Sequence, residues 1–369
     1  MKIDVYAKEK NLTGVDLTLF WLDSFEFLTI NKKHKLLNLM LEEKNFNFEK
    51  NREKIIKIVG ENNFNFMRDR KTNDYLNTVF EKVHKFCDFV VLTNENYPME
   101  LRNIYEAPLV LYYKGDISLL KNKNIIAVTG SRSYDNYGFV VTQSFVKTLI
   151  DASMTIVCGV NEGIESIIIK TAIQKKGKII VVLNGGFNVI YPSISASLVN
   201  YVSKSGLVLS EQSPLVQNSK FGITTKNRII TGVANSLLIT QAGKNSGTKY
   251  AVNYALEQNK NIYAICGNIT TEKSAYCNEL IKECQSMLVL SPLDILEDLH
   301  IPYNQEQTGE ITEVEQAVLN CIAENSNSAH FDYILEKIGL DKKELLVVLS
   351  TLEINGKIKR MTGNFFVKI

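Results

Sequence analysis

Hydrophobic spacing divides the chain into three parts, and the first reads as helical. Residues 1–90 carry apolar residues at intervals of three and four, as in LTLFWLDSFEFL and YLNTVFEKVHKF, between polar stretches rich in Asn and Lys. This spacing places one apolar stripe on each helix. We therefore predict a small helical domain over residues 1–90.

The second part, residues 91–300, has a different pattern. Short β-branched runs such as NIIAVTG, MTIVCG and SLLITQA alternate with amphipathic helical segments such as FVVTQSFVKTLIDAS. Strands separated by helices of this length form βαβ units, with a parallel sheet covered on both faces. The predicted fold class is α/β, with a Rossmann-like central domain and a mostly parallel sheet.

Small or polar residues end nearly every predicted strand of the central domain. In an open α/β sheet, ligands bind beyond the carboxyl ends of the strands, so these residues are expected to meet at one site. Taken singly, each is more simply explained as a turn residue. The strand-end residues are Gly130, Gly159, Asn184, Gly185, Gly186, Ser210, Gln241, Gly243 and Gly267.

The third part follows a polar linker at residues 301–310. Residues 311–369 predict three helices and then a hairpin that turns at residues 362–364. Three helices and a hairpin form a winged helix. Its third predicted helix, DKKELLVVLSTLE, has few basic residues, so contact with protein or dimerisation is favoured over the reading of DNA.

Composition narrows the classes of protein to which the chain can belong. The chain of 369 residues is 45% hydrophobic and 22% charged, with a formal net charge of +2, which is typical of a globular protein and does not by itself indicate nucleic-acid binding. It shows no secretory leader and no long apolar run, so we expect a cytoplasmic protein without membrane contact. The six cysteines form no CxxC pair, and neither a disulfide framework nor a metal site is expected.

The stretch NIIAVTGSRSYDNYG offers the first candidate site. Gly130, Ser131 and Arg132 follow a buried strand and precede a helix. Backbone N–H groups in such a turn bind anions, and the Arg fork matches phosphate oxygens. The stretch lacks the GxGxxG pattern of dinucleotide sites, so no cofactor is predicted. A tight turn with a surface arginine is the simpler alternative.

Two further segments carry candidate phosphate or base contacts. Residues 218–232 hold Lys220, Lys226 and Arg228 near Phe221, and cations beside an aromatic ring are typical of single-strand binding surfaces. A solvated helix start with one core phenylalanine explains the same residues equally well. A second helix start on the same edge is expected at Ser246, Gly247 and Thr248.

The central domain lacks the residue combinations of common catalytic sites. The four histidines, His34, His84, His300 and His330, all lie outside the predicted sheet or at its margins. Glu162, Glu165 and Glu211 form no convincing pair for acid/base work. We therefore predict that the site holds an anion without transforming it, and that the chain is not an enzyme.

Taken in order, these segments resemble the DNA-processing protein A family, also called Smf. The segments that carry the resemblance are NENYPMELRNIYEAPLVLYYKG, GSR at 130–132, YG at 137–138, CGVNEGIES at 158–166, LNGGFNVIYP at 183–192, SE at 210–211, KNRIITG at 226–232, SGT at 246–248 and ICG at 265–267. They cover residues 95–299. The flanking domains match the family's layout of an N-terminal helical, SAM-like domain and a C-terminal winged helix.

The resemblance implies a function. Members of this family bind single-stranded DNA without cutting it, form dimers and help to load the RecA recombinase during natural transformation. It assigns phosphate binding to Gly130, Ser131 and Arg132, and a basic element to the run from Lys226 through Asn227 to Arg228. Lys220 and Phe221 follow less directly, because Phe221 precedes Lys226 by five residues where the family has three.

Some positions depart from the family pattern. Glu162, Glu165 and Ile169 stand where the family has arginine, aspartate and histidine, and Lys226 replaces an arginine. A glutamate near a phosphate path repels the ligand, so weaker or displaced DNA binding is expected.

Two other functions remain open. One is a nucleoside-monophosphate phosphoribohydrolase-like enzyme, although AGKNSGTKYAVNYA has no glutamate before Glu257. The other is a nucleotide-sensing module.

Overall fold

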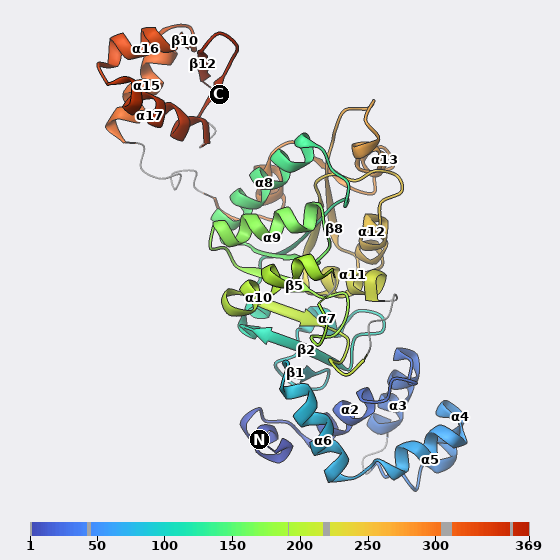
Figure 1. Cartoon of the computed structure of the whole chain (residues 1–369). Coiled ribbons are helices and arrows are strands. Elements are labelled where there is room, and N and C mark those ends of the chain that lie inside the picture. Colours follow the sequence, from blue (N-terminus) through green and yellow to red (C-terminus); the bar gives the residue numbers. More distant parts are fainter. Residues whose placement is uncertain are drawn as a thin grey trace. The chain divides into compact units, whose positions relative to one another are not determined.

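The computed structural model describes residues 2–42, 46–190, 192–216, 222–303, 312–354 and 357–368. Lys220 and Phe221 lie outside the described residues. The chain forms two compact units, residues 1–302 and residues 303–369, which are coloured blue to orange and orange to red in Figure 1.

A nine-stranded sheet organises the first unit. Its strand order is β1-β2-β6-β5-β4-β3-β7-β8-β9. The run β6-β5-β4-β3-β7-β8-β9 is parallel, while β2 is antiparallel to both β1 and β6. The strands are β1 (Asp88–Val91), β2 (Val110–Gly115), β3 (Ile125–Thr129), β4 (Thr155–Cys158), β5 (Ile179–Val182), β6 (Leu207–Ser210), β7 (Ser236–Ile239), β8 (Asn261–Ile265) and β9 (Met287–Val289).

The Rossmann-like fold predicted from the sequence is confirmed. The strand order reverses between β3 and β7, which is the point where ligands bind in such sheets. Every residue of β3, β4, β5, β6 and β7 is buried, because helices cover both faces, and this explains the continuous apolar runs. Strands β1 and β2 were not predicted, since they pair antiparallel and the helix between them, Met99–Arg102, has only four residues.

Helices cover the two faces of this sheet (Figure 1). On one face α8, α9, α10 and α14 pack side by side, and α11 packs with α12 and α7 on the other. Short 3-10 turns η1 (Ile117–Lys121), η2 (Ser193–Ser195) and η3 (Glu272–Ser274) lie in the connections. The helices are α7 (Met99–Arg102), α8 (Asn136–Asp151), α9 (Ile164–Gln174), α10 (Ala196–Ser205), α11 (Gly222–Val233), α12 (Thr248–Glu257), α13 (Ala275–Lys282) and α14 (Pro292–Asp298).

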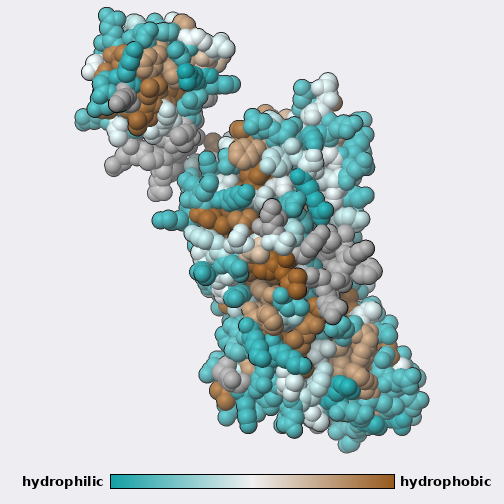
Figure 2. Space-filling model, viewed as in Figure 1, coloured by the Kyte–Doolittle hydropathy of each residue, from teal (hydrophilic) through white to brown (hydrophobic). Residues whose placement is uncertain are grey.

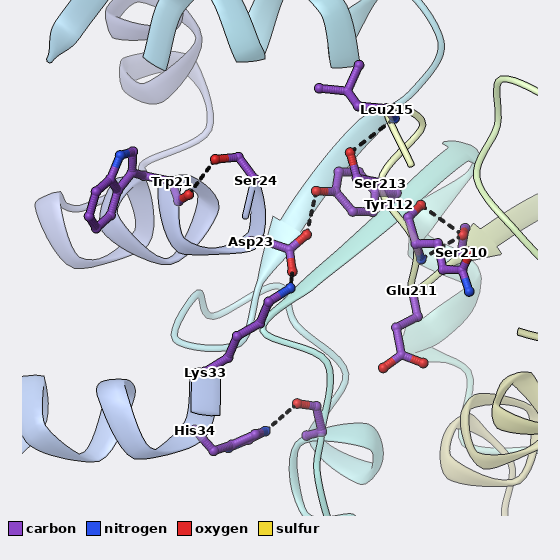
Figure 3. A network of polar contacts seen from close by, with 12 residues as sticks. Trp21, Asp23, Ser24, Lys33, His34, Tyr112, Ser210, Glu211, Ser213 and Leu215 are labelled. Carbon is purple, nitrogen blue, oxygen red and sulfur yellow. Dashed lines mark hydrogen bonds and ion pairs between the residues drawn. The ribbon is translucent and has the colours of Figure 1, made fainter. Parts of the chain in front are cut away.

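The N-terminal helices share one hydrophobic core with the β1–β2 end of the sheet. The rings of Phe20 and Phe89 stack with centroids 4.1 Å apart. Asp23 accepts a hydrogen bond of 2.6 Å from the Tyr112 hydroxyl and pairs with Lys33 at 2.5 Å (Figure 3). These helices are α1 (Ile3–Glu9), α2 (Gly14–Asp23), α3 (Ile30–Glu42), α4 (Arg52–Val59), α5 (Glu61–Asp69) and α6 (Asn73–His84).

The second unit is the predicted winged helix. Its three helices surround a core that includes Ile322, Leu349 and Phe366, and its small sheet has the order β10-β12-β11. The hairpin turns where the sequence predicted, with Gly363 and Asn364 at positive φ of 77° and 58°. Its elements are α15 (Glu313–Glu324), β10 (Ser328–His330), α16 (Phe331–Ile338), α17 (Lys342–Ile354), β11 (Ile358–Arg360) and β12 (Phe365–Lys368).

Candidate functional site

The chain's own side chains fill the crevice between β3 and β7. Gln241 is fully buried there; its side-chain N–H donates to Asp135 Oδ1 at 2.9 Å, and its Oε1 accepts from the Asp135 backbone N–H at 3.2 Å. The Ser131 backbone N–H donates to the Gln241 carbonyl at 2.8 Å. A Cβ atom at Gly138 would overlap the Gln241 side chain. A nucleotide at this point would have to displace these contacts.

Asp135 also occupies the start of α8, where the sequence predicted an anion nest. As the N-cap residue, its carboxylate accepts the Gly138 backbone N–H at 2.9 Å. This bond, and then the one from Gln241, lower the pKa of Asp135 below its ordinary value. The predicted backbone donors of Ser131 and Gly138 are therefore used within the protein, and the cationic side chain of the turn remains to bind an anion.

Arg132 is exposed on a loop that the protein holds in place. The Ile164 backbone N–H donates to the Ser131 carbonyl at 3.1 Å. Gly163, at a φ of 84°, lies so close that a Cβ atom there would be 2.5 Å from the Arg132 Cα. In the part of the chain that the structure describes, Arg132 forms no salt bridge within 4.0 Å. Its guanidinium is thus presented to solvent from a fixed backbone.

Lys273 is a further cation at this edge, and sequence reasoning missed it. It lies in η3, after β8, and its Nζ contacts the Ser133 hydroxyl of the same loop. Sequence separation hides this contact, because the two partners are 140 positions apart in the chain. The only signal in the sequence is its position shortly after a strand that ends in glycine.

Lys226, predicted as a phosphate contact, is buried in an ion pair. Its Nζ lies 3.1 Å from Glu165 Oε2, and the two side chains are 2% and 5% exposed. The same Glu165 oxygen accepts the Asn161 backbone N–H at 2.6 Å. A Cβ atom at Gly159 would overlap the Lys226 ammonium. Phosphate contact by Lys226 would therefore require this pair to break, and the pair instead joins α11 to the start of α9.

Arg228 is also buried, at 7% exposure. Its guanidinium bonds the Glu211 carboxylate and the Glu106 carbonyl. Burial raises the pKa of Glu211, although the nearby Arg228 charge lowers it. The geometry makes Arg228 an internal tie between α11, the end of β6 and the loop before β2.

A groove of about 1270 Å³ lies beside Arg228 in the first unit. Six carboxylates and three cations line it, so its field is unfavourable for phosphate. Two of the lining residues, Lys33 and Asp23, form an ion pair, and Asp23 also accepts the hydroxyl of the buried Tyr112 (Figure 3). The charged lining residues are Asp23, Glu26, Glu100, Glu106, Glu211, Glu257, Lys33, Arg228 and Lys260.

The remaining predicted residues lie within α11 and at the start of α12. Asn227 is buried at 7% exposure between the two ion-paired cations. Gly247 is exposed at the start of α12, where the Ser246 hydroxyl accepts the Thr248 backbone N–H at 3.2 Å. Among the described residues, no cluster of three or more His, Cys, Asp or Glu side chains is suited to a metal ion.

Comparisons with known proteins agree with this architecture. The model of the DNA recombination-mediator protein A family matches residues 88–300, and that of the DprA winged helix domain matches residues 305–364. The DNA processing protein DprA of Streptococcus pneumoniae is 35% identical over 216 residues, which cover 58% of this chain and 75% of the relative. The protein Smf of Escherichia coli is 29% identical over 282 residues, 74% and 75% of the two chains.

Solved structures show the same fold. The crystal structure of the S. pneumoniae protein has a TM-score of 0.68 at 29% identity, covering 78% of this chain and 99% of that one. The Helicobacter pylori DNA processing protein A has a TM-score of 0.53 at 22% identity, covering 59% and 98%. Since the first family model spans more than half of the sequence, the chain belongs to the DNA recombination-mediator protein A family.

Proposed function

We propose that this protein binds single-stranded DNA at the carboxyl edge of its sheet, without cleaving it and without a cofactor, and acts in recombination and uptake of DNA. The observation that carries the proposal is Arg132, an exposed guanidinium on a loop fixed from both sides, next to Lys273. A guanidinium on a rigid backbone suits a repeated phosphate ligand. The H. pylori relative is described by its single-stranded DNA binding mode, which supports the same ligand here.

The filled crevice weighs against the two nucleotide-based alternatives. Gln241 and Asp135 occupy the point where a mononucleotide would bind in this architecture. Glu257, the first glutamate after the SGT segment, is the last residue of α12, a full helix away from the edge that holds Arg132. A strand of DNA that crosses the outer surface of the edge does not need the crevice.

A binding titration tests the proposal. We expect a fluorescent oligothymidylate of about 20 nucleotides to bind with affinity that falls as salt rises, with a log–log slope of about −0.7 for each phosphate neutralised. In a thermal-shift screen the same oligonucleotide should raise the melting temperature, since a ligand of the native state stabilises it, while mononucleotides should not. A shift with mononucleotides alone would favour the sensing module, and release of free base from them would favour the enzyme.

Two protein contacts belong to the proposal. Strand β9 is an edge of the sheet and exposes Leu288, and Leu290, directly after the strand, is 73% exposed. Such an edge favours pairing with a second copy, so we infer a homodimer. The winged-helix unit exposes Leu346 and Val347 on α17, and Figure 2 shows an apolar patch on this unit. This favours protein contact, which we assign to a RecA-type recombinase.

Light scattering after size-exclusion chromatography checks both contacts. We expect the parent to elute at twice the mass of the chain, and the L288E/L290E variant at the mass of one chain, because two buried carboxylates would face each other across the pairing. Added recombinase should form a heavier complex with the parent and not with L346D/V347D. A monomeric parent would contradict the dimer, and equal complex formation by L346D/V347D would contradict the winged-helix contact.

The proposal places the protein in the cytoplasm, with DNA and recombinase. Within the described ranges, the structure contains no helix with the length and apolarity that crossing a bilayer requires.

A further inference from the structure

We propose that the bases of the bound strand stack on Tyr134 and Tyr137, beside the phosphate contacts of Arg132 and Lys273. The inference rests on the proposed function and specifies what the protein contacts in its ligand, namely the planar faces of unpaired bases. Stacking on aromatic rings is how single-stranded DNA binds without sequence preference. Neither tyrosine was singled out as a site residue from the sequence.

Tyr137 offers a ring that the protein already holds in position. It lies in the first turn of α8 and is 42% exposed. Its hydroxyl donates to the Cys266 carbonyl at 2.5 Å, and its Cε1 lies 3.6 Å from where a Cβ of Gly267 would be. One edge of the ring is therefore tied to the loop after β8. A ring fixed in advance loses little conformational entropy when a base stacks on it.

Tyr134 lies on the loop between Arg132 and the N-cap Asp135 and is 41% exposed. It follows Arg132 by two residues, a separation of at most about 7 Å along the backbone. A base whose phosphate contacts Arg132 is thus within reach of the Tyr134 ring. The same loop carries both kinds of contact that a single strand needs.

Cations and neighbouring loops make this one continuous surface. Lys273 contacts Ser133 of the Tyr134 loop, and a Cβ atom at Gly243, after β7, would lie 2.7 Å from the Glu272 carbonyl of η3. Lys244, next to Gly243, is exposed. Two exposed carboxylates, Glu272 beside Lys273 and Glu162 beside Gly163, lie on or beside these loops, and the three cations outnumber them. The loops after β3, β7 and β8 therefore present phosphate-binding charge around the two rings.

A pair of oligonucleotides separates stacking from backbone contact. We would titrate oligothymidylate and an abasic oligonucleotide of equal length, which has the phosphates and lacks the bases. Y134A and Y137A should weaken binding of oligothymidylate by roughly 5- to 150-fold, the loss expected for one stacked base, with an unchanged salt slope. Both should bind the abasic strand as the parent does. R132A should bind both strands less tightly.

Controls keep the outcome decisive. Y201A removes a tyrosine that is 50% exposed on α10 and should leave both affinities unchanged. Y137F keeps the ring and loses the hydroxyl that ties it to the Cys266 carbonyl, so it should bind between the parent and Y137A. Y134A remains informative if Y137A fails to fold. Parental affinity of both alanine variants for oligothymidylate, or equal loss on both strands, would overturn the stacking while R132A still supports the proposed function. A parent that binds neither strand would overturn the proposed function itself.

Discussion

Replacing Lys226 by methionine is expected to lower the free energy of unfolding by about 3–5 kcal/mol, the usual cost of leaving one buried charge without its partner. The Glu165 side chain is 5% exposed in the parent, and in K226M its carboxylate would keep, among its described partners, the Asn161 backbone N–H. The effect should appear in urea unfolding followed by circular dichroism. The folded fraction of K226M should bind DNA with the affinity of the parent, because Lys226 faces the interior.

Two control variants test whether the loss of stability in K226M comes from the unpaired buried charge. The double variant K226M/E165Q removes both charges and keeps an oxygen that accepts the Asn161 N–H, so it should regain much of the lost stability. K175M breaks a half-exposed pair, in which Lys175 and Asp151 lie 2.7 Å apart, and should cost about 1 kcal/mol or less. Equal stability of K226M and K175M would contradict an internal role for Lys226.

Replacing Arg132 by alanine is expected to reduce affinity for oligothymidylate by about 10- to 150-fold, which corresponds to the loss of about 1.5–3 kcal/mol for bonds to a charged group. The fold should be unaffected, because the Arg132 side chain is exposed and the loop is held through the backbone at Gly163 and Ser131. Fluorescence anisotropy at low salt measures the affinity, and thermal melting reports the fold.

Two further variants distinguish the exposed Arg132 from the buried cation Arg228 as the DNA contact. R132K keeps the charge and loses the planar fork, so it should bind between the parent and R132A. R228A removes the partner of Glu211 and should lower stability more than it lowers affinity at temperatures where the variant is folded. If R228A abolished binding without loss of stability while R132A bound normally, the site would lie in the groove and not at the Arg132 edge.

The sequence predicted the sheet well because its strands are buried on both faces and alternate with helices. It also placed Arg132 correctly at the end of β3, since a strand, a glycine and a helix start define that position locally. The edge strand β1 and its neighbour β2 were missed because they pair antiparallel, without the crossover helix that marks the others.

The sequence could not predict whether the cationic side chains of α11 point to solvent or into the protein. Whether Lys226 points to solvent or inward depends on Glu165, which is 61 residues away in the sequence, and on how α9 and α11 meet across the sheet. In the sequence alone, Glu165 and Lys226 are two separate departures from the family pattern. The structure shows that they contact each other, so the two departures form one ion pair inside the protein.

The acidic groove explains why net charge was a poor guide to the site. With a formal charge of +2, the chain has no overall attraction for DNA, and the groove beside Arg228 is lined by more carboxylates than cations. Attraction must then be local. Arg132, Lys273 and Lys244 supply it at the edge that also exposes the two tyrosines.

Contact between Arg132 and the phosphates of single-stranded DNA, at the carboxyl edge of the sheet, is the core of the proposed function. Its sharpest test is the salt dependence of oligothymidylate binding by the parent, R132A and the remote control K175A. We expect R132A to have a log–log slope shallower by about 0.7 than the parent, and K175A to keep the parental slope. A slope for R132A equal to that of the parent, at equal affinity, would contradict this contact.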